Sequence, residues 1–193
     1  MKKIFIIVGV LTVASSMYAQ QKDGNTNKTS FHFSGIAQVG LLQGQGPSAF
    51  QAQSISGIRY KTWFAGAGIG IDNYMLRTIP LFLDLRKNIL NKESSPYVFT
   101  DIGLGFPWLR KDQENLHFNS DFSNGLYYNA GLGYSISIAK RKALLLSTAF
   151  SLKQLREKRY GYIPWCENNC QLSLVGTDKY TLRRISLAIG LSF

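Results

Sequence analysis

Apolar side chains occupy every second position over much of the chain, and the closing stretch shows this pattern most clearly. From 185 to 193 the odd positions are Ile, Leu, Ile, Leu and Phe, while the even positions between them are Ser, Ala, Gly and Ser. A period of two residues places alternate side chains on opposite faces of a β-strand. The stretch 183–193 therefore predicts a strand with one apolar face and one face of small or polar residues.

Seven earlier segments alternate in the same way, so the sequence predicts eight strands. The seven are Phe31–Leu42, Ala49–Tyr60, Trp63–Ile71, Thr78–Lys87, Tyr97–Phe106, Gly125–Ala139 and Ala143–Lys153. Tight turns are expected at Lys61 and at Lys140–Lys142. Two long polar segments, 107–124 and 155–180, have no apolar alternation, and we expect both to be loops.

The second face of these strands distinguishes between two architectures. A soluble β-sandwich or lipocalin-like barrel would present Lys, Glu, Gln and Thr to water on that face. Here the face is mostly Gly, Ser and Ala, with an occasional Asp or Arg. Small residues suit the interior of an eight-stranded barrel, which has room only for side chains. The chain is therefore predicted to be an all-β, eight-stranded antiparallel up-and-down transmembrane β-barrel, with its apolar face towards lipid.

The first 19 residues predict export. They read MKKIFIIVGVLTVASSMYA, with two lysines before an apolar run and a small residue before Gln20. That run is shorter than the roughly 20 residues of a membrane-spanning helix, so we interpret 1–19 as a cleaved signal peptide. Residues 20–30 are expected to be a flexible N-terminal segment and 31–193 the barrel domain. With the start of the barrel in the periplasm, both long segments face outwards and the tight turns face inwards, as in outer-membrane barrels.

Composition adds a charge argument. The 193 residues carry a net charge of +11, which suits nucleic acid, an anionic membrane surface or no partner at all. Export excludes nucleic acid. The expected anionic partner is the lipopolysaccharide of a Gram-negative outer membrane, whose phosphates pair well with basic side chains. The residues expected to make this contact are Arg156, Lys158, Arg159 and Arg183.

Two further groups of residues suggest chemistry inside the barrel or in its loops. Asp84, Arg86, Asp101 and Arg184 lie on the interior face, where we expect a salt-bridged network that fills the lumen; a conducting pore is the alternative. Cys166 and Cys170, in the run CENNC, are expected to form a disulfide, because the chain is exported. A metal site would need further ligands, so no metal or cofactor is expected.

Several short motifs, taken in order, resemble a known family. They are Gly68-Ile-Gly-Ile-Asp72, Ile79-Pro-Leu-Phe-Leu-Asp-Leu-Arg86, Pro96-Tyr97, Gly103-Leu-Gly105, Gly131-Leu-Gly-Tyr134 and the terminal phenylalanine. Over roughly 31–193 the chain resembles the small outer-membrane β-barrel proteins common in Bacteroidetes. The resemblance implies a fold and a location, and it implies that the terminal strand is read by the barrel-assembly machinery. It implies no reaction.

The function expected from these observations is non-enzymatic. The barrel would be structural, or would use segments 107–124 and 155–180 for interactions at the cell surface. A small porin for low-mass solutes is the first alternative. Lipid A modification is the second, but His117, Ser120 and Ser123 match the motif of the deacylase only loosely, and no glutamate follows until Glu157. A nucleophile without a base within reach is inert.

Overall fold

The computed structural model describes residues 31–44, 46–73, 76–108, 120–162 and 172–193. The signal peptide and the segment 20–30 predicted from the sequence lie outside these residues. The strands are β1 (His32–Gly44), β2 (Ala49–Tyr60), β3 (Trp63–Asn73), β4 (Arg77–Asn88), β5 (Ser95–Pro107), β6 (Ser120–Ser123), β7 (Gly125–Ala139), β8 (Lys142–Tyr162) and β9 (Leu172–Ser192). Within the described part of the chain, no helix is both long and apolar enough to cross a membrane.

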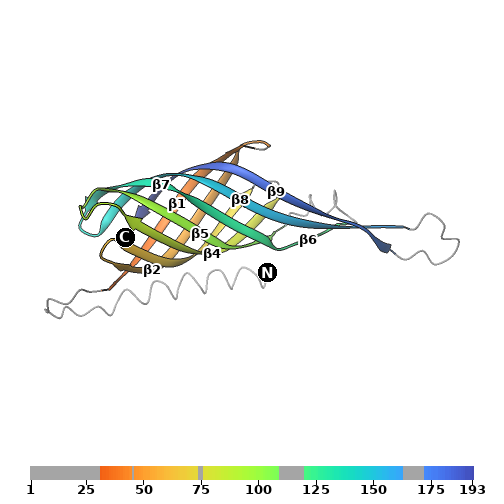
Figure 1. Ribbon diagram of the computed structural model, residues 1–193, viewed down its shortest axis with the longest axis horizontal. Coiled ribbons are helices and arrows are strands. Elements are labelled where there is room, and N and C mark those ends of the chain that lie inside the picture. Colours follow the sequence, from red (N-terminus) through yellow and green to blue (C-terminus); the bar gives the residue numbers. More distant parts are fainter. Residues whose placement is uncertain (1–30, 45, 74–75, 109–119, 163–171) are drawn as a thin grey trace, which may run out of the picture.

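Eight of these strands form a closed antiparallel ring. Each pairs with its neighbour in the order β1-β2-β3-β4-β5-β7-β8-β9 (Figure 1). The first and last strands close the ring, in a register that runs from Ile36 opposite Ser192 to Gly44 opposite Arg184. The predicted all-β, eight-stranded up-and-down barrel is thus confirmed. β6 lies outside the ring and pairs with β8 alone among the described strands.

The two faces of the strands point as the alternation predicted. The apolar series faces outwards, and large side chains such as Leu83 (64% exposed), Leu132 and Ile185 are not covered. The other series faces the lumen, where Ser186 and Ser192 are buried. Each strand of the ring thus exposes large apolar side chains on its outer face, while polar and charged residues are buried inside together with apolar ones.

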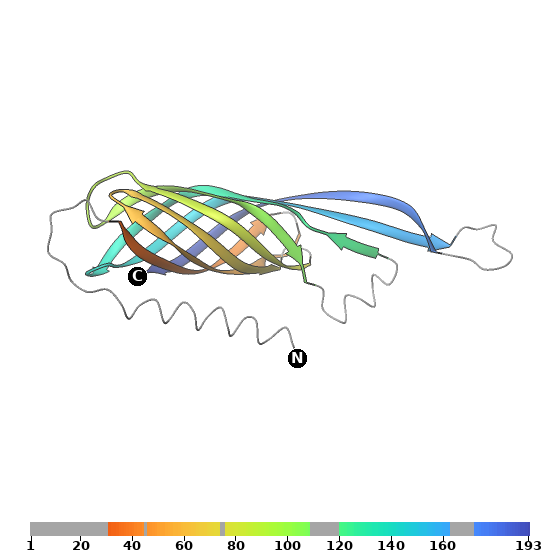
Figure 2. The same ribbon diagram turned by 90° about the horizontal axis from the view of Figure 1, so that it is seen from below.

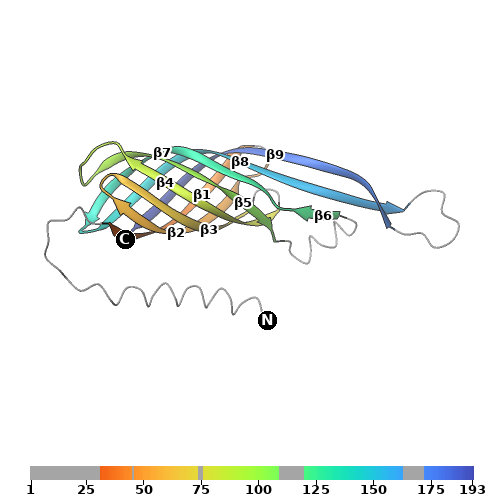
Figure 3. The same cartoon turned by 60° about the horizontal axis from the view of Figure 1, so that its bottom comes forward.

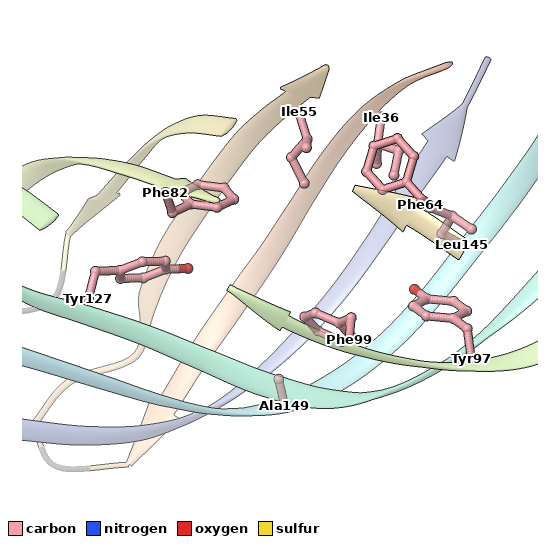
Figure 4. Packing of buried hydrophobic residues seen from close by; sticks show 9 residues of the cluster. All are labelled: Ile36, Ile55, Phe64, Phe82, Tyr97, Phe99, Tyr127, Leu145 and Ala149. Atoms are coloured by element: carbon pink, nitrogen blue, oxygen red, sulfur yellow. The ribbon is translucent and has the colours of Figure 1, made fainter. Parts of the chain in front are cut away.

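The lumen is filled by large side chains that use the space left by glycines. A methyl group at Gly68 would lie 2.5 Å from the Phe82 ring, and one at Gly133 would lie 2.3 Å from the Tyr97 ring. Each glycine therefore faces an aromatic ring inside the barrel, which explains why interior positions alternate between very small and large residues. Figure 4 shows the buried cluster, which consists of Ile36, Ile55, Phe64, Phe82, Tyr97, Phe99, Tyr127, Leu145 and Ala149.

The segment 155–180, predicted to be a long loop, is largely strand, and the segment 107–124 contains a short strand, so that part of the prediction was wrong. β8 and β9 continue to pair from Lys153 opposite Leu182 out to Tyr162 opposite Leu172, and only 163–171 lies outside the description. We call the two-stranded part formed by 154–162 and 172–182 the ribbon; Figures 2 and 3 show it projecting past the barrel. In segment 107–124, Pro107 ends β5 and residues 120–123 form β6, which pairs with β8 up to Arg159.

The physical reason for this error is that the ribbon covers little apolar core: Leu155 and Leu182 are packed at its base, and polar residues follow them. A pair of strands outside the barrel can be polar on both faces, so its sequence loses the alternation that marks a half-buried strand. We name the two ends of the barrel the ribbon end and the turn end. The turn end carries the tight connections at Lys61 and Arg141, which were predicted correctly and have left-handed φ angles of 53° and 65°.

Candidate functional sites in the lumen and on the ribbon

Three of the four predicted lumen charges meet in the middle of the barrel. Asp84 on β4 lies directly opposite Asp101 on β5, and Arg86 lies two residues further along β4. The Arg86 guanidinium donates to both oxygens of Asp84, with Nε at 3.0 and 2.9 Å and Nη2 at 2.8 Å from Oδ2. All three side chains are buried, so this is a desolvated charge cluster with one cation for two carboxylates.

Neutral groups complete the cluster. Asn129 donates an amide hydrogen bond of 3.0 Å to Asp101, and Arg86 Nη2 donates one of 3.2 Å to the amide oxygen of Gln38. The Arg86 guanidinium also lies over the rings of Tyr97 and Phe99, at 5.7 and 5.1 Å from their centroids. The structure thus brings Asp84, Arg86 and Asp101 together across β4 and β5, and amides and rings share the charge of Arg86.

A chain of amides links this cluster to the opposite wall. Gln38 on β1 donates to Gln53 on β2, whose amide in turn donates to the Tyr127 hydroxyl at 2.7 Å. Gln38, Gln53 and Tyr127 were not predicted from the sequence to be functional. Their positions on the interior face of strands rich in Ser and Gly are the signal that could have identified them, since a glutamine there has only the lumen to occupy.

A second buried ion pair lies nearer the ribbon end. Lys153 on β8 bonds to the carboxylate of Asp72 on β3 and to the hydroxyl of Thr78 on β4. The side chain of Lys153 is fully buried. Lys153 follows Ser147, Ala149 and Ser151 on the interior face of β8, which explains why it lies in the lumen.

Arg184, the fourth predicted lumen charge, comes from the last strand. It is buried on β9 beside Ser151 of β8 and Gly44 of β1. Its Nη1 donates a 2.7 Å hydrogen bond to the carbonyl of Pro47, in the connection between β1 and β2. Arg184 therefore holds that connection against the ribbon end of the lumen.

The predicted lipopolysaccharide contacts divide between the two faces of the ribbon and the adjoining strand. Arg156, Lys158 and Arg183 are exposed on the face that continues the apolar exterior of β8 and β9, and Lys179 lies directly opposite Arg156 on this face. We call these four residues the basic face. Arg159 points to the other face, where its guanidinium pairs with Asp178 at 2.6 Å.

That other face of the ribbon carries its acidic groups. The Tyr180 hydroxyl donates a 3.0 Å hydrogen bond to Oε2 of Glu157, and this bond, more than burial, raises the pKa of Tyr180. Glu157 and Asp178 thus balance Arg159, whereas the carboxylate in register with the basic face is Asp121 of β6, opposite Lys158. The two faces of the ribbon therefore differ in charge. The sequence did not reveal this difference, because the segment was predicted to be a loop and a loop has no faces.

The remaining candidate residues have the following places. Cys166, Cys170, His117 and its neighbours up to 119 lie outside the described residues, so the predicted disulfide stays a prediction. His32 lines a cavity at the turn end. Among the described residues, no three His, Cys, Asp or Glu side chains gather in a way that could hold a metal ion.

Comparison with known proteins gives a structural likeness. No family model matches the chain, and no curated protein matches it. Among solved structures the chain is similar to outer membrane protein AlkL, determined by solid-state NMR in DMPC lipid bilayers, with 13% sequence identity and a TM-score of 0.48. The alignment covers 90% of this chain and 93% of that chain. This identity is too low to transfer a function.

Proposed function

We propose that the protein is a non-enzymatic outer-membrane barrel that acts at the cell surface, and that the basic face of its ribbon binds the phosphates of lipopolysaccharide. The observation that carries the proposal is the position of four cations immediately beyond an uncovered apolar belt. In the Gram-negative outer membrane, the phosphates of lipid A lie at that height, just outside the hydrocarbon layer.

The exterior of the ring supports a membrane location. Every strand of the ring exposes large apolar side chains on its outer face. Together they form a belt larger than the apolar patches that soluble monomers usually expose. Exposed aromatics mark both borders of this belt: Phe50 and Trp108 towards the ribbon end, and Phe33, Trp63 and Phe193 towards the turn end. Such girdles are typical of barrels at the two membrane interfaces. In the proposed orientation the ribbon faces outwards and the turn end faces the periplasm.

The filled lumen favours this proposal over the porin alternative. The aromatic cluster crosses the middle of the barrel, and the Asp84–Arg86 pair with its amides occupies the same level. Eight strands leave an interior just wide enough for such side chains. A planar-bilayer recording of the purified barrel should therefore show no conductance steps, and regular steps would favour the porin.

The basic face supplies the argument for the ligand. Arg156 and Lys179 are cross-strand neighbours, and like charges directly opposite one another destabilise a sheet. A phosphate between them would remove that repulsion and accept charge-assisted hydrogen bonds from both side chains. Because the same face continues into the lipid-facing side chains Phe150 and Ile185, a ligand there can also place acyl chains on the apolar belt.

The test is a binding measurement with purified lipopolysaccharide on the detergent-folded barrel. The double variant R156Q/K179Q should lose about tenfold or more in affinity, since two charge-assisted contacts disappear. Its melting temperature without ligand should not fall, because a repulsive pair is removed. The control K140Q/K142Q loses the same charge at the turn end and should bind normally. Equal affinity of R156Q/K179Q and the unaltered protein would contradict the proposal.

Two further parts of the proposal have their own tests. Lipid A extracted from cells with and without the protein should have the same mass spectrum, since we propose no enzymatic activity; a changed acyl pattern would overturn that. The barrel-assembly machinery is the proposed partner during insertion, through the terminal strand that ends at Phe193. Replacing that phenylalanine with Ser should lower the amount of folded protein in the membrane.

A further inference from the structure

The turn end contains a cavity of about 900 Å³ that the proposed surface function does not use. Strand ends of β1, β2 and β7 line it, together with the connections β2–β3, β4–β5 and β7–β8. Ser34 and Ser135, which are buried on the interior faces of β1 and β7, place the cavity within the ring of strands. It is therefore a vestibule of the lumen, open towards the turn end.

The vestibule is strongly positive. Its basic side chains are Arg59, Lys61, Lys92, Lys140, Arg141 and Lys142, and Glu93 is the one acidic side chain among the described residues that line it. The ion pairs found among the described residues involve none of these cations. They come from three separate connections and one strand, so the folded barrel brings together charges that are scattered in the sequence.

Arg59 is the cation held most firmly. It is half-buried near the end of β2, and its guanidinium lies 5.8 Å from the centroid of the Phe64 ring. A guanidinium placed on an aromatic ring, with lysines around the same cavity, is a donor set suited to a multivalent oxyanion.

The backbone gives an independent reason to regard these cations as functional. Lys61 and Arg141 both have positive φ angles, a conformation that Gly and Asn adopt at lower cost than other residues. Two-residue hairpin turns usually carry Asn or Gly there for that reason. Both connections instead place a cation in the strained position, and both cations line the same vestibule. Strain retained at two converging sites indicates a role that a better turn residue would not fulfil.

We propose that this vestibule is a binding site for a phosphate-bearing ligand with two or more negative charges. The cations surround an opening that faces along the barrel axis, which favours a soluble phosphate compound on the periplasmic side. The headgroup of an anionic phospholipid offers the same chemistry from the inner leaflet. The two sources share their contacts with Arg59, Lys61 and Arg141 and differ in whether a membrane supplies the ligand.

The experiment measures pyrophosphate binding by calorimetry to the complete barrel folded in detergent at low salt. The variant K61N/R141N removes two cations and relieves both left-handed residues. Its affinity for pyrophosphate should fall about tenfold or more, while its urea midpoint should equal or exceed that of the unaltered protein. The control R77Q/R159Q removes two cations at the ribbon end and should leave pyrophosphate binding unchanged.

The outcomes distinguish site, source and fold. Saturable binding that K61N/R141N weakens and the control does not supports the site. If vesicles containing phosphatidylglycerol, but not vesicles of phosphatidylcholine alone, abolish pyrophosphate binding, the ligand is the lipid headgroup; if neither does, it is the soluble phosphate. No saturable binding, or equal weakening by the control, would overturn the proposal. A folding defect cannot produce the expected result, since the variant is predicted to be at least as stable.

Discussion

Replacing Arg86 with Met should destabilise the barrel severely, because it leaves two buried carboxylates without their cation. Met retains most of the volume of the side chain, so the effect reports charge and hydrogen bonding more than packing. Asp84 would lose three contacts of 2.8 to 3.0 Å from the guanidinium. Asp101, directly across the strand pair, would then face Asp84 with the Asn129 amide as its donor and no cation beside it.

The expected cost follows from what removal of one partner does in a desolvated site. Breaking a buried ion pair typically costs about 3 to 5 kcal/mol, most of it from the charge that remains. The lost contacts with the rings of Tyr97 and Phe99 add about 1 kcal/mol or more. We therefore expect R86M to lower the free energy of unfolding by roughly 4 kcal/mol, summed from these effects.

The assay is urea-induced unfolding of the barrel refolded into lipid vesicles, followed by tryptophan fluorescence and by the heat-dependent shift on detergent gels. Two companion variants complete a double-mutant cycle: D84N, and D84N/R86M. Because the double variant removes both charges of the pair, it should be more stable than R86M and show a coupling of about 2 kcal/mol or more. The midpoint of R86M alone should be the lowest of the set.

Two results would refute this reasoning. If R86M lowered the free energy of unfolding by less than about 1 kcal/mol, the Asp84–Arg86 pair would behave like a solvent-screened surface pair. That result would mean that water fills the lumen. Additive effects of D84N and R86M would show that the two side chains act independently, contrary to their contacts. Either result would also weaken the case against a pore, because that case rests on a packed lumen.

Three more predictions follow from single contacts. Gly133→Ala should destabilise the barrel by about 1 to 3 kcal/mol, because its methyl group would lie 2.3 Å from the Tyr97 ring; urea unfolding measures this, and an unchanged midpoint would contradict the packing. Lys153→Met should cost about 3 kcal/mol or more by the same assay, since it leaves a buried carboxylate unpaired, and a gain in stability would contradict the ion pair. Tyr180 should titrate above the ordinary tyrosine pKa of about 10, because its hydroxyl donates a hydrogen bond to Glu157. This bond stabilises the ribbon below the ordinary tyrosine pKa, and the stabilisation is lost as the pH rises through the raised pKa. The ultraviolet difference titration of the unaltered protein against Y180F measures that pKa, and a value below 10 would be contrary to the bond.

The barrel could be predicted from the sequence because its strands are asymmetric. In β4, Leu81, Leu83 and Leu85 face outwards while Phe82 and Asp84 face inwards, so the period of two is plain. Adjacent strands also share a level, which is why Asp84 and Asp101 were expected to meet. Both inferences need only local pattern and strand order.

The ribbon could not be predicted in the same way. Between Gln154 and Tyr162 polar residues occupy both faces, and the pairing with β9 depends on a partner many residues away. Arg184 shows a second limit: the alternation gives the face of its side chain but not its hydrogen-bond acceptor, the carbonyl of Pro47, which lies in a connection. The vestibule shows a third limit, because its cations come together only when the ring of strands closes.

The central claim is that the ring spans the outer membrane with the ribbon outside and the turn end in the periplasm. Intact cells labelled with a membrane-impermeant amine reagent test it directly, followed by mass spectrometric mapping of the modified lysines. All the probed side chains are exposed on the folded chain, so modification reports the compartment. With the ribbon outside, the reagent should modify Lys158 and Lys179 in intact cells. It should modify Lys61 and Lys140 only after the outer membrane is permeabilised. Equal labelling of both pairs in intact cells, or labelling of Lys61 and Lys140 alone, would contradict it.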